Sequence, residues 1–262
     1  MRSRSFGVLI LSGLVAAGTL GVATASAKPV APASAPTVPP LATGLVPAGW
    51  ARPQLGPAGA RWSDGVSVDG RMQVLVQQDA GERGPTTGTT TRFGILTAGA
   101  PIRTITLTGR FGFDALSRNG RSLFLTENMD AVAPGTYRVR MFDVATGALR
   151  PEAVVDRKLD LEALPSPDEE QMYGYAKART ASPVHPKWIF TLYDATGKHP
   201  FVHALNTDGT ALCIDLPSHN ASAESIEMGW KLKVDTKFLR IENTNLGKAW
   251  RVPVGARTAV QL

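Results

Sequence analysis

Apolar and polar residues alternate in many short stretches of the chain from Val66 onward. Alternation with a period of two predicts β-strands with one buried face, whereas an amphipathic helix shows a period near 3.6. Only residues 159–164 approach a helical pattern, and Pro165 ends that stretch before it is long enough to change the fold class. Asp-Gly and Asn-Gly pairs separate several alternating stretches, where they favour tight hairpin turns. The pattern therefore predicts an all-β fold.

One arrangement of four strands recurs along the chain, and such recurrence predicts a repeat architecture. The clearest copy has strands at 112–117, 122–126, 137–143 and 153–155, with the turn Arg118-Asn119-Gly120-Arg121 between the first two. A second copy covers 176–216, and after its turn at 182–187 it has strands at 188–193, 201–205 and 211–216. The strands of the weaker copies on either side lie at 72–76, 93–96, 102–107, 230–234, 238–241, 249–252 and 258–262.

Four copies of four strands correspond to about 50 residues per unit, close to the spacing of β-propeller blades. A single blade has two open edges and needs a neighbour to form a core. We therefore predict a β-propeller of about four four-stranded antiparallel blades. The number of blades stays open at this point. Four blades either close a small ring or leave the propeller incomplete. A further sheet could come from a second chain or from the N-terminal segment, which includes Leu41, Leu45, Val46 and Trp50.

Two stretches in the clearest copy carry a resemblance to a known class: Ser117-Arg118-Asn119-Gly120-Arg121 and Phe142-Asp143-Val144-Ala145-Thr146-Gly147. They resemble blades of secreted bacterial propellers of the YVTN/WD40-like class, in which Ser-Pro-Asp-Gly-Arg precedes an aromatic strand and Asp-x-x-Thr-Gly follows it. Val184-His185 and Asp235-Thr236-Lys237 depart from that pattern. The resemblance covers roughly residues 60–255 and implies a propeller fold and an exported location, but no particular activity.

The N-terminal residues predict export from the cytoplasm. Arg2 and Arg4 precede an uncharged apolar run from Phe6 to Val22, and Ala25-Ser26-Ala27 matches the site that a signal peptidase recognises. The run approaches the length of a membrane span, so a retained anchor is the alternative. We predict a cleaved signal peptide over 1–27 and no transmembrane helix in the mature chain. The mature protein is then secreted or associated with the cell envelope.

The next stretch, 28–59, is rich in alanine and proline, which predicts an extended linker because it buries little apolar surface. The propeller domain is predicted over 60–262. The chain has one cysteine, Cys213, so it forms no internal disulfide, and this residue is expected in a buried strand.

The formal net charge of +6 suggests a polyanionic partner, but the position of the charges weakens that interpretation. Residues 1–60 contain four basic residues and no acidic one. The remaining residues contain 24 basic and 22 acidic residues, a net charge of +2. A nearly neutral domain is not typical of a phosphate-binding surface, so we predict no nucleic-acid partner.

No motif of a serine hydrolase, a zinc protease, a Walker loop, a dinucleotide-binding loop or an EF-hand occurs in the sequence. We therefore expect no cofactor and no metal, and the catalytic residues, if any, are unknown. His203 lies in the apolar run 201–205, where a histidine is usually a packed core residue. The alternative is a binding or acid–base group facing a central channel. His199 has the spacing of a helical metal pair with His203, but Pro200 and the strand context remove that geometry.

Two carboxylates complete the set of binding candidates. Asp114 lies in a predicted inner strand, where it either pairs with an arginine of another blade, Arg138 or Arg179, or faces the channel. Asp215, near the end of a later strand, is the other. The binding candidates from sequence alone are therefore His203, His199, Asp114, Asp215 and Arg138.

Other notable side chains are expected to be structural. Asp143 and Asp194, each followed closely by Thr-Gly, are expected to fix turns through side-chain to backbone hydrogen bonds. The five tryptophans are expected to pack between blades, and an aromatic platform for a sugar is the alternative.

These features support an exported, non-catalytic propeller that binds an unknown protein or cell-envelope ligand outside the membrane. The alternative is an extracytoplasmic propeller enzyme, a hydrolase or lyase that acts on a sugar or lactone through His203 and channel carboxylates. A purely structural spacer of the envelope is a third hypothesis.

The signal sequence generates the first testable prediction. Cleavage after Ala27 leaves a mature chain that begins at Lys28, because the A-x-A pattern ends there. Mass measurement of the exported protein checks this. A full-length mass in the membrane fraction would instead identify a retained anchor.

Overall fold

The computed structural model describes residues 41, 46–53, 58–77, 90–129, 136–155, 172–194, 199–216 and 229–262. The chain divides into two units, Met1–Thr37 and Val38–Leu262, and all described residues lie in the second. Within the described ranges, no helix has the length and apolar composition that crossing a membrane requires.

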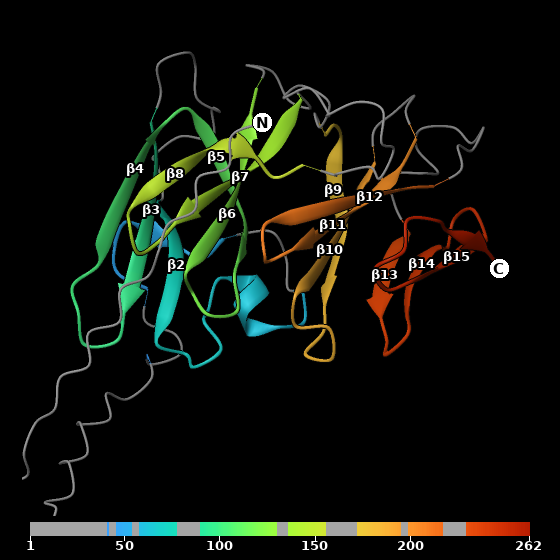
Figure 1. Ribbon diagram of the computed structural model, residues 1–262, viewed down its shortest axis with the longest axis horizontal. Coiled ribbons are helices and arrows are strands. Elements are labelled where there is room, and N and C mark those ends of the chain that lie inside the picture. The colour runs from blue at the N-terminus through green and yellow to red at the C-terminus, as the bar shows by residue number, and fades with distance from the viewer. Residues whose placement is uncertain are drawn as a thin grey trace, which may run out of the picture. The chain divides into compact units, whose positions relative to one another are not determined.

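Four sheets of four antiparallel strands make up the described residues, and the strands of each sheet follow one another in the sequence (Figure 1). We number them sheets 1 to 4. Sheet 1 contains β1 (Trp50–Ala51), β2 (Met72–Gln77), β3 (Thr90–Thr97) and β4 (Arg103–Thr108), and sheet 2 contains β5 (Arg110–Leu116), β6 (Ser122–Asn128), β7 (Tyr137–Asp143) and β8 (Ala148–Ala153). Sheet 3 contains β9 (Tyr175–Ala181), β10 (Trp188–Asp194), β11 (Phe201–Asn206) and β12 (Thr210–Asp215), and sheet 4 contains β13 (Trp230–Val234), β14 (Phe238–Asn243), β15 (Lys248–Pro253) and β16 (Val260–Gln261).

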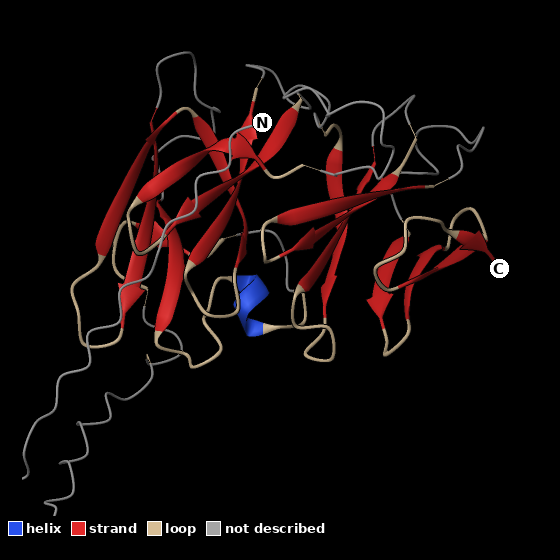
Figure 2. Cartoon of the chain, in the orientation of Figure 1, coloured by secondary structure: helices blue, strands red, loops and turns tan. Residues whose placement is uncertain are grey.

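This meander order is the topology of propeller blades, so the predicted all-β fold with four four-stranded antiparallel blades is confirmed. Strands dominate the described residues, as Figure 2 shows, and the short 3-10 helix η1 (Arg61–Asp64) interrupts them. The sequence pattern had not predicted η1. Residues 159–164 lie outside the described residues.

Two strands differ from the positions that the pattern predicts. The outer strand of sheet 2 is β8, whereas alternation favoured residues 153–155, of which only Ala153 belongs to it. Most residues of β8 are exposed, because it is an edge strand, so apolar alternation does not mark it. The first strand of sheet 1 comes from the stretch predicted as a linker: Trp50 and Ala51 pair with Gln77 and Val76 of β2.

Three clusters of buried apolar side chains hold the sheets together, and each cluster joins two sheets that are consecutive in the sequence. Phe93 of sheet 1 lies with Phe113 and Leu125 of sheet 2 in one of them. Phe124 of sheet 2 lies with Ile189 of sheet 3 in another, and the chain around η1 adds Trp62 to it. None of the three clusters combines described residues of sheet 4 with those of sheet 1.

The third cluster packs one face of sheet 4 against sheet 3. Trp230, Ile241 and Trp250 contribute from sheet 4, and Phe190 and Leu192 from sheet 3. The Trp230 and Trp250 rings stack with their centroids 6.0 Å apart. The expected packing of tryptophans between blades is confirmed at these two residues and at Trp62.

Ile241 and its neighbour Glu242 test this packing, because Ile241 is fully buried against sheet 3 and Glu242 is exposed on the opposite face. We expect Ile241→Ala to lower the free energy of unfolding by about 2–5 kcal/mol through lost burial and a residual cavity. Glu242→Ala should change it by less than about 0.5 kcal/mol. Urea denaturation measures both values, and equal effects would contradict the described packing.

Candidate functional site

Two turns with nearly the same sequence have the same hydrogen bonds. In the first, Ser67 Oγ donates to Asp69 Oδ1 at 2.5 Å, and the Met72 amide donates back to Ser67 Oγ at 2.9 Å. The Arg71 amide also donates to Asp69 Oδ1, at 3.0 Å. Each of these bonds has a counterpart in the turn between β5 and β6, where Ser117, Asn119, Arg121 and Ser122 take the corresponding places. The two repeats therefore share a hydrogen-bond pattern as well as a sequence pattern, with Asn119 in the place of Asp69.

Glycine is needed in both turns. Gly70 and Gly120 have φ of 69° and 71°, in the left-handed region that disfavours other residues. Gly120 also lies against the first turn, because a Cβ placed on it would be 3.2 Å from Met72 Sδ. The Val68 amide donates to the Arg118 carbonyl at 3.5 Å, so the two turns are in direct contact.

The corresponding turns of sheets 3 and 4 use other residues. Ser182 Oγ accepts from the Val184 amide at 3.2 Å in sheet 3. In sheet 4, Asp235 Oδ1 accepts from the amides of Lys237 and Phe238, both at 2.8 Å. These hydrogen bonds and the salt bridge from Arg240 hold the pKa of the Asp235 carboxyl at about 2. His185 Nε2 lies 2.9 Å from the Asp235 carbonyl, which connects the two turns. The departures from the Asp-Gly pattern therefore preserve a closed turn.

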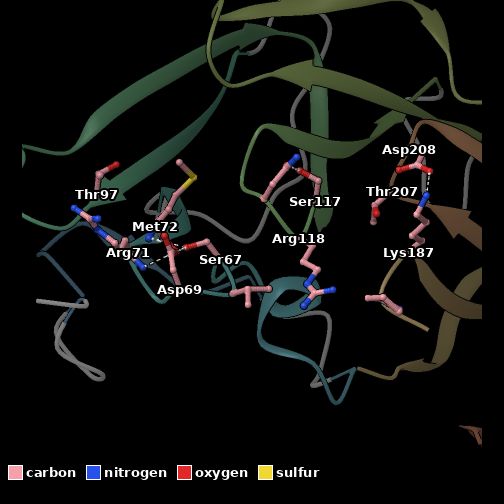
Figure 3. Close-up of a pocket in the computed structure, with 13 residues that line it drawn as sticks. Ser67, Asp69, Arg71, Met72, Thr97, Ser117, Arg118, Lys187, Thr207 and Asp208 are labelled. Atoms are coloured by element: carbon pink, nitrogen blue, oxygen red, sulfur yellow. Dashed lines mark hydrogen bonds and ion pairs between the residues drawn. The ribbon is translucent and has the colours of Figure 1, made fainter. Parts of the chain in front are cut away.

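A pocket of about 810 Å³ opens where turns of sheets 1, 2 and 3 meet. Figure 3 shows Thr97 and Arg71 on one side of it, Lys187 and Asp208 on the other, and Arg118 between them. The residues that line the pocket are Ser67, Val68, Asp69, Arg71, Met72, Thr97, Ser117, Arg118, Asn119, Pro186, Lys187, Thr207 and Asp208.

Three basic and two acidic side chains line this pocket, which we call the turn pocket. The Ser67 hydroxyl that donates to Asp69 holds the pKa of that carboxyl below its usual value, and Arg71 adds a smaller attraction. Lys187 Nζ donates to Asp208 Oδ2 at 2.8 Å, and both side chains are more than half exposed. The Arg118 guanidinium has no hydrogen bond or ion pair with any residue that the structure describes, so it is available to a ligand.

None of the five candidates from sequence lines the turn pocket. His203 is 2% exposed in the middle of β11, opposite Thr191 and Cys213 of the neighbouring strands. His199 is exposed, and its carbonyl accepts from the Tyr173 hydroxyl at 3.1 Å. Asp215 is exposed at the end of β12. The burial of His203 is that of a core histidine, and no group of metal-ligating side chains occurs among the described residues.

Asp114 is part of a buried ionic cluster. It lies at a β-bulge in β5 and is 3% exposed. Arg179 Nη2 donates to the Asp114 carbonyl and lies 3.9 Å from its carboxylate. Arg179 also donates to the Ser63 carbonyl at 3.0 Å and lies 3.9 Å from Asp64 of η1. The expected pairing of Asp114 with an arginine of another blade is confirmed for Arg179, which therefore connects sheets 2 and 3 with η1.

Arg138, the other arginine proposed for Asp114, pairs within its own sheet instead. Its Nε donates to Glu127 Oε2 at 2.7 Å, and Arg140 Nη1 donates to the same oxygen at 2.6 Å. Burial works against ionisation of Glu127, but these two arginines hold the pKa of its carboxyl below the usual value. The pairing of Arg138 with Asp114 is therefore wrong, because Glu127 lies directly opposite Arg138 on β6.

Of the two turns expected at aspartates, the described residues contain the one at Asp143. Asp143 Oδ1 accepts from the amides of Ala145 and Thr146, both at 2.9 Å, so its expected turn is confirmed. Asp194 is 4% exposed, and its Oδ2 accepts from Trp230 Nε1 at 2.9 Å. Asp194 thus joins sheet 3 to sheet 4 through this buried hydrogen bond, and the turn expected after it, at residues 195–198, lies outside the described residues. Cys213 lies in a strand as expected but is only partly buried.

Sequence reasoning missed Arg71, Arg118 and Lys187 as site residues. A signal was present, since each stands in or beside the turn that precedes the second strand of a blade. Repeated turns end at the same edge of stacked sheets, so a basic residue in several of them indicates a shared cationic site. The search for catalytic motifs directed attention to strand residues instead.

No family model and no curated protein matches this sequence. Among solved structures, the chain is similar to hydrazine synthase from Kuenenia stuttgartiensis, with 14% identity and a TM-score of 0.41, over 72% of this chain and 51% of that one. It is also similar to a TolB-type protein from Agrobacterium tumefaciens, with 11% identity and a TM-score of 0.35, over 71% and 62% of the two chains. The chain thus spans less than two thirds of either structure, and the site rests on its own residues.

Arg179 generates a prediction about stability. We expect Arg179→Met to lower the free energy of unfolding by about 3–5 kcal/mol, because it leaves the buried Asp114 carboxylate without its cation. Arg138→Met removes an arginine whose side chain is 25% exposed, and Glu127 keeps Arg140, so about 1 kcal/mol or less is expected. Chemical denaturation of the two variants compares them. A smaller loss for Arg179→Met than for Arg138→Met would be inconsistent with the cluster.

Proposed function

We propose that this chain is an exported, non-catalytic β-propeller of the YVTN/WD40-like class that binds a ligand outside the cytoplasmic membrane. The turn pocket is the observation that carries the proposal, because it is a concave site built by turns of three consecutive sheets. The signal-like N-terminus and the Ala/Pro-rich stretch after it support export. The repeated Ser-x-Asp/Asn-Gly-Arg turns support the class.

The turns are suited to binding because their shape is fixed before a ligand arrives. The side-chain hydrogen bonds within the turns at Ser67 and Ser117, and the contact of Gly120 with Met72, hold two walls of the pocket in place. A preorganised site loses less conformational entropy when a ligand binds, which leaves more of the contact energy as affinity. Loops on a rigid scaffold are also the usual position of binding residues.

The charge of the pocket favours a ligand with at least one anionic group. Arg118 offers a guanidinium whose planar donors match a carboxylate or phosphate. Lys187 also lines the pocket. Its exposed ion pair with Asp208 contributes about 0–1 kcal/mol, so an anionic ligand can replace Asp208 as its partner at little cost.

Binding is preferred over hydrolase or lyase activity because the proposed acid–base groups and the pocket are separate. His203 is buried in the core of sheet 3, and Asp114 is engaged by Arg179. Neither residue lines the turn pocket, and Asp215 does not line it either. A catalytic group has to reach the reacting atoms of a bound substrate.

Retention of a ligand by the immobilised full chain tests this proposal. We expect the wild-type chain to retain a ligand from a cell-envelope extract and Arg118→Ala to weaken that retention by about 10-fold to 100-fold, as the loss of a charged hydrogen bond predicts. Arg121→Ala is the matched control. It removes the same charge from an exposed residue of the same turn that does not line the pocket.

Comparison of the three proteins decides the outcome. Retention by the wild type and Arg121→Ala, with loss in Arg118→Ala, supports the proposal. Equal retention by all three, no retained ligand at all, or turnover of a substrate by the wild-type chain would overturn it.

A further inference from the structure

The positive charge of the chain is concentrated in its last sheet. Residues 229–262 contain seven basic and two acidic residues, a net charge of +5. Residues 61–228 contain 17 basic and 20 acidic residues, a net charge of −3. The net charge of +2 over the whole domain is therefore the sum of two regions of opposite sign. Such asymmetry along a chain is typical of proteins that bind a polyanion through one region.

The strands of sheet 4 place this charge on one face. Lys231 and Lys233 on β13, Arg240 on β14 and Arg251 on β15 are all exposed. The residues between them in sequence point to the other face, where Leu232, Ile241, Trp250 and their neighbours pack against sheet 3. Successive residues of a strand alternate between faces, so the four cations share the face that sheet 3 does not cover. We call it the basic face.

Three of these cations form a row across the strands. Lys233 is directly opposite Arg240, and Arg240 is directly opposite Arg251. Like charges in directly opposite positions destabilise a sheet. Pairing between the strands therefore does not favour this row of cations.

The neighbouring groups neutralise this face only in part. Arg240 Nε lies 3.0 Å from Asp235 Oδ2 in an exposed ion pair, and Glu242 is directly opposite Lys231. The Arg251 guanidinium lies over the Phe238 ring, 5.4 Å from its centre, which orients the cation and leaves its charge in place.

We propose that the basic face of sheet 4 is a docking surface for a linear acidic polysaccharide, a glycan with carboxylate groups along its length. Charge complementarity carries the proposal: four exposed cations on three adjacent strands meet a chain of anions. This surface is distinct from the turn pocket, to which sheet 4 contributes no residue, and the inference does not depend on the function proposed for that pocket.

The chemistry of the basic face favours an acidic glycan over two other partners, a protein and a single-stranded nucleic acid. The centre of a protein–protein interface is depleted in charged residues, whereas the basic face presents four exposed cations, two of them lysines. Proteins that bind single-stranded nucleic acid present aromatic rings on which bases stack. Phe238 is the aromatic residue on the basic face, and Arg251 lies over its ring. The face thus offers cations without a free stacking platform, which suits a glycan.

Binding of the full chain to polygalacturonate, a linear polymer of a uronic acid, tests the proposal. We expect wild-type binding at low salt that weakens as salt is added. The Lys233→Gln/Arg251→Gln variant should bind at least about tenfold more weakly, and the slope of log affinity against log salt should fall in magnitude by roughly one for each cation removed. Neutral dextran and duplex DNA are the comparison polymers.

A second double variant separates the basic face from overall charge. Arg92→Gln/Arg150→Gln removes two exposed cations from strands of sheets 1 and 2, and it should keep wild-type affinity. The unfolding midpoints of both variants confirm that they fold. Equal losses in the two variants, dextran binding as strong as polygalacturonate binding, or tighter binding of duplex DNA than of polygalacturonate would each overturn the proposal.

Discussion

The structure depends on the burial of one sheet against the next. A four-stranded meander cannot bury its apolar face alone, so each sheet is stable only where another covers it. The three buried clusters satisfy this requirement between sheets 1 and 2, 2 and 3, and 3 and 4. The same stacking brings turns that are far apart in sequence to one edge. The turn pocket is thus a consequence of how the sheets bury their faces, because Ser67, Ser117 and Lys187 are far apart in sequence and line one pocket only when the sheets stack.

Polar groups inside the stack connect sheets. Arg179 joins β9 to the bulge at Asp114 and to η1, and Asp194 accepts from Trp230 across the junction of sheets 3 and 4. Burial also raises the pKa values of Tyr137 and Tyr193, whose ring centroids lie 5.4 Å apart. Buried polar groups need partners, and these groups find theirs on the neighbouring sheet, so each of them also links two sheets. The turn pocket and the basic face are the two surfaces for which we propose ligands.

Strands with one buried face were predictable from sequence, because alternation records burial directly, as in Trp230-Lys231-Leu232-Lys233. β8 was not predictable in the same way, since an exposed edge strand has no apolar alternation. For Asp114, the sequence could not decide between Arg138, Arg179 and a position facing the channel, because that choice depends on how two sheets stack. The turn pocket could not be predicted either, because it too depends on how the sheets stack. The basic face was hidden by averaging, since the charge of sheet 4 disappears in a sum over the domain.

The central claim is that a ligand binds in the turn pocket, whereas the buried strand residues hold the sheets together. Hydrogen–deuterium exchange of the full chain tests it most directly, measured alone and with the ligand that the wild-type chain retains from the envelope extract. The account predicts slower exchange on binding in the segments 67–72, 117–119 and 186–187, which contain residues that line the turn pocket. Protection confined to the strand around His203, with no change in those turns, would contradict it.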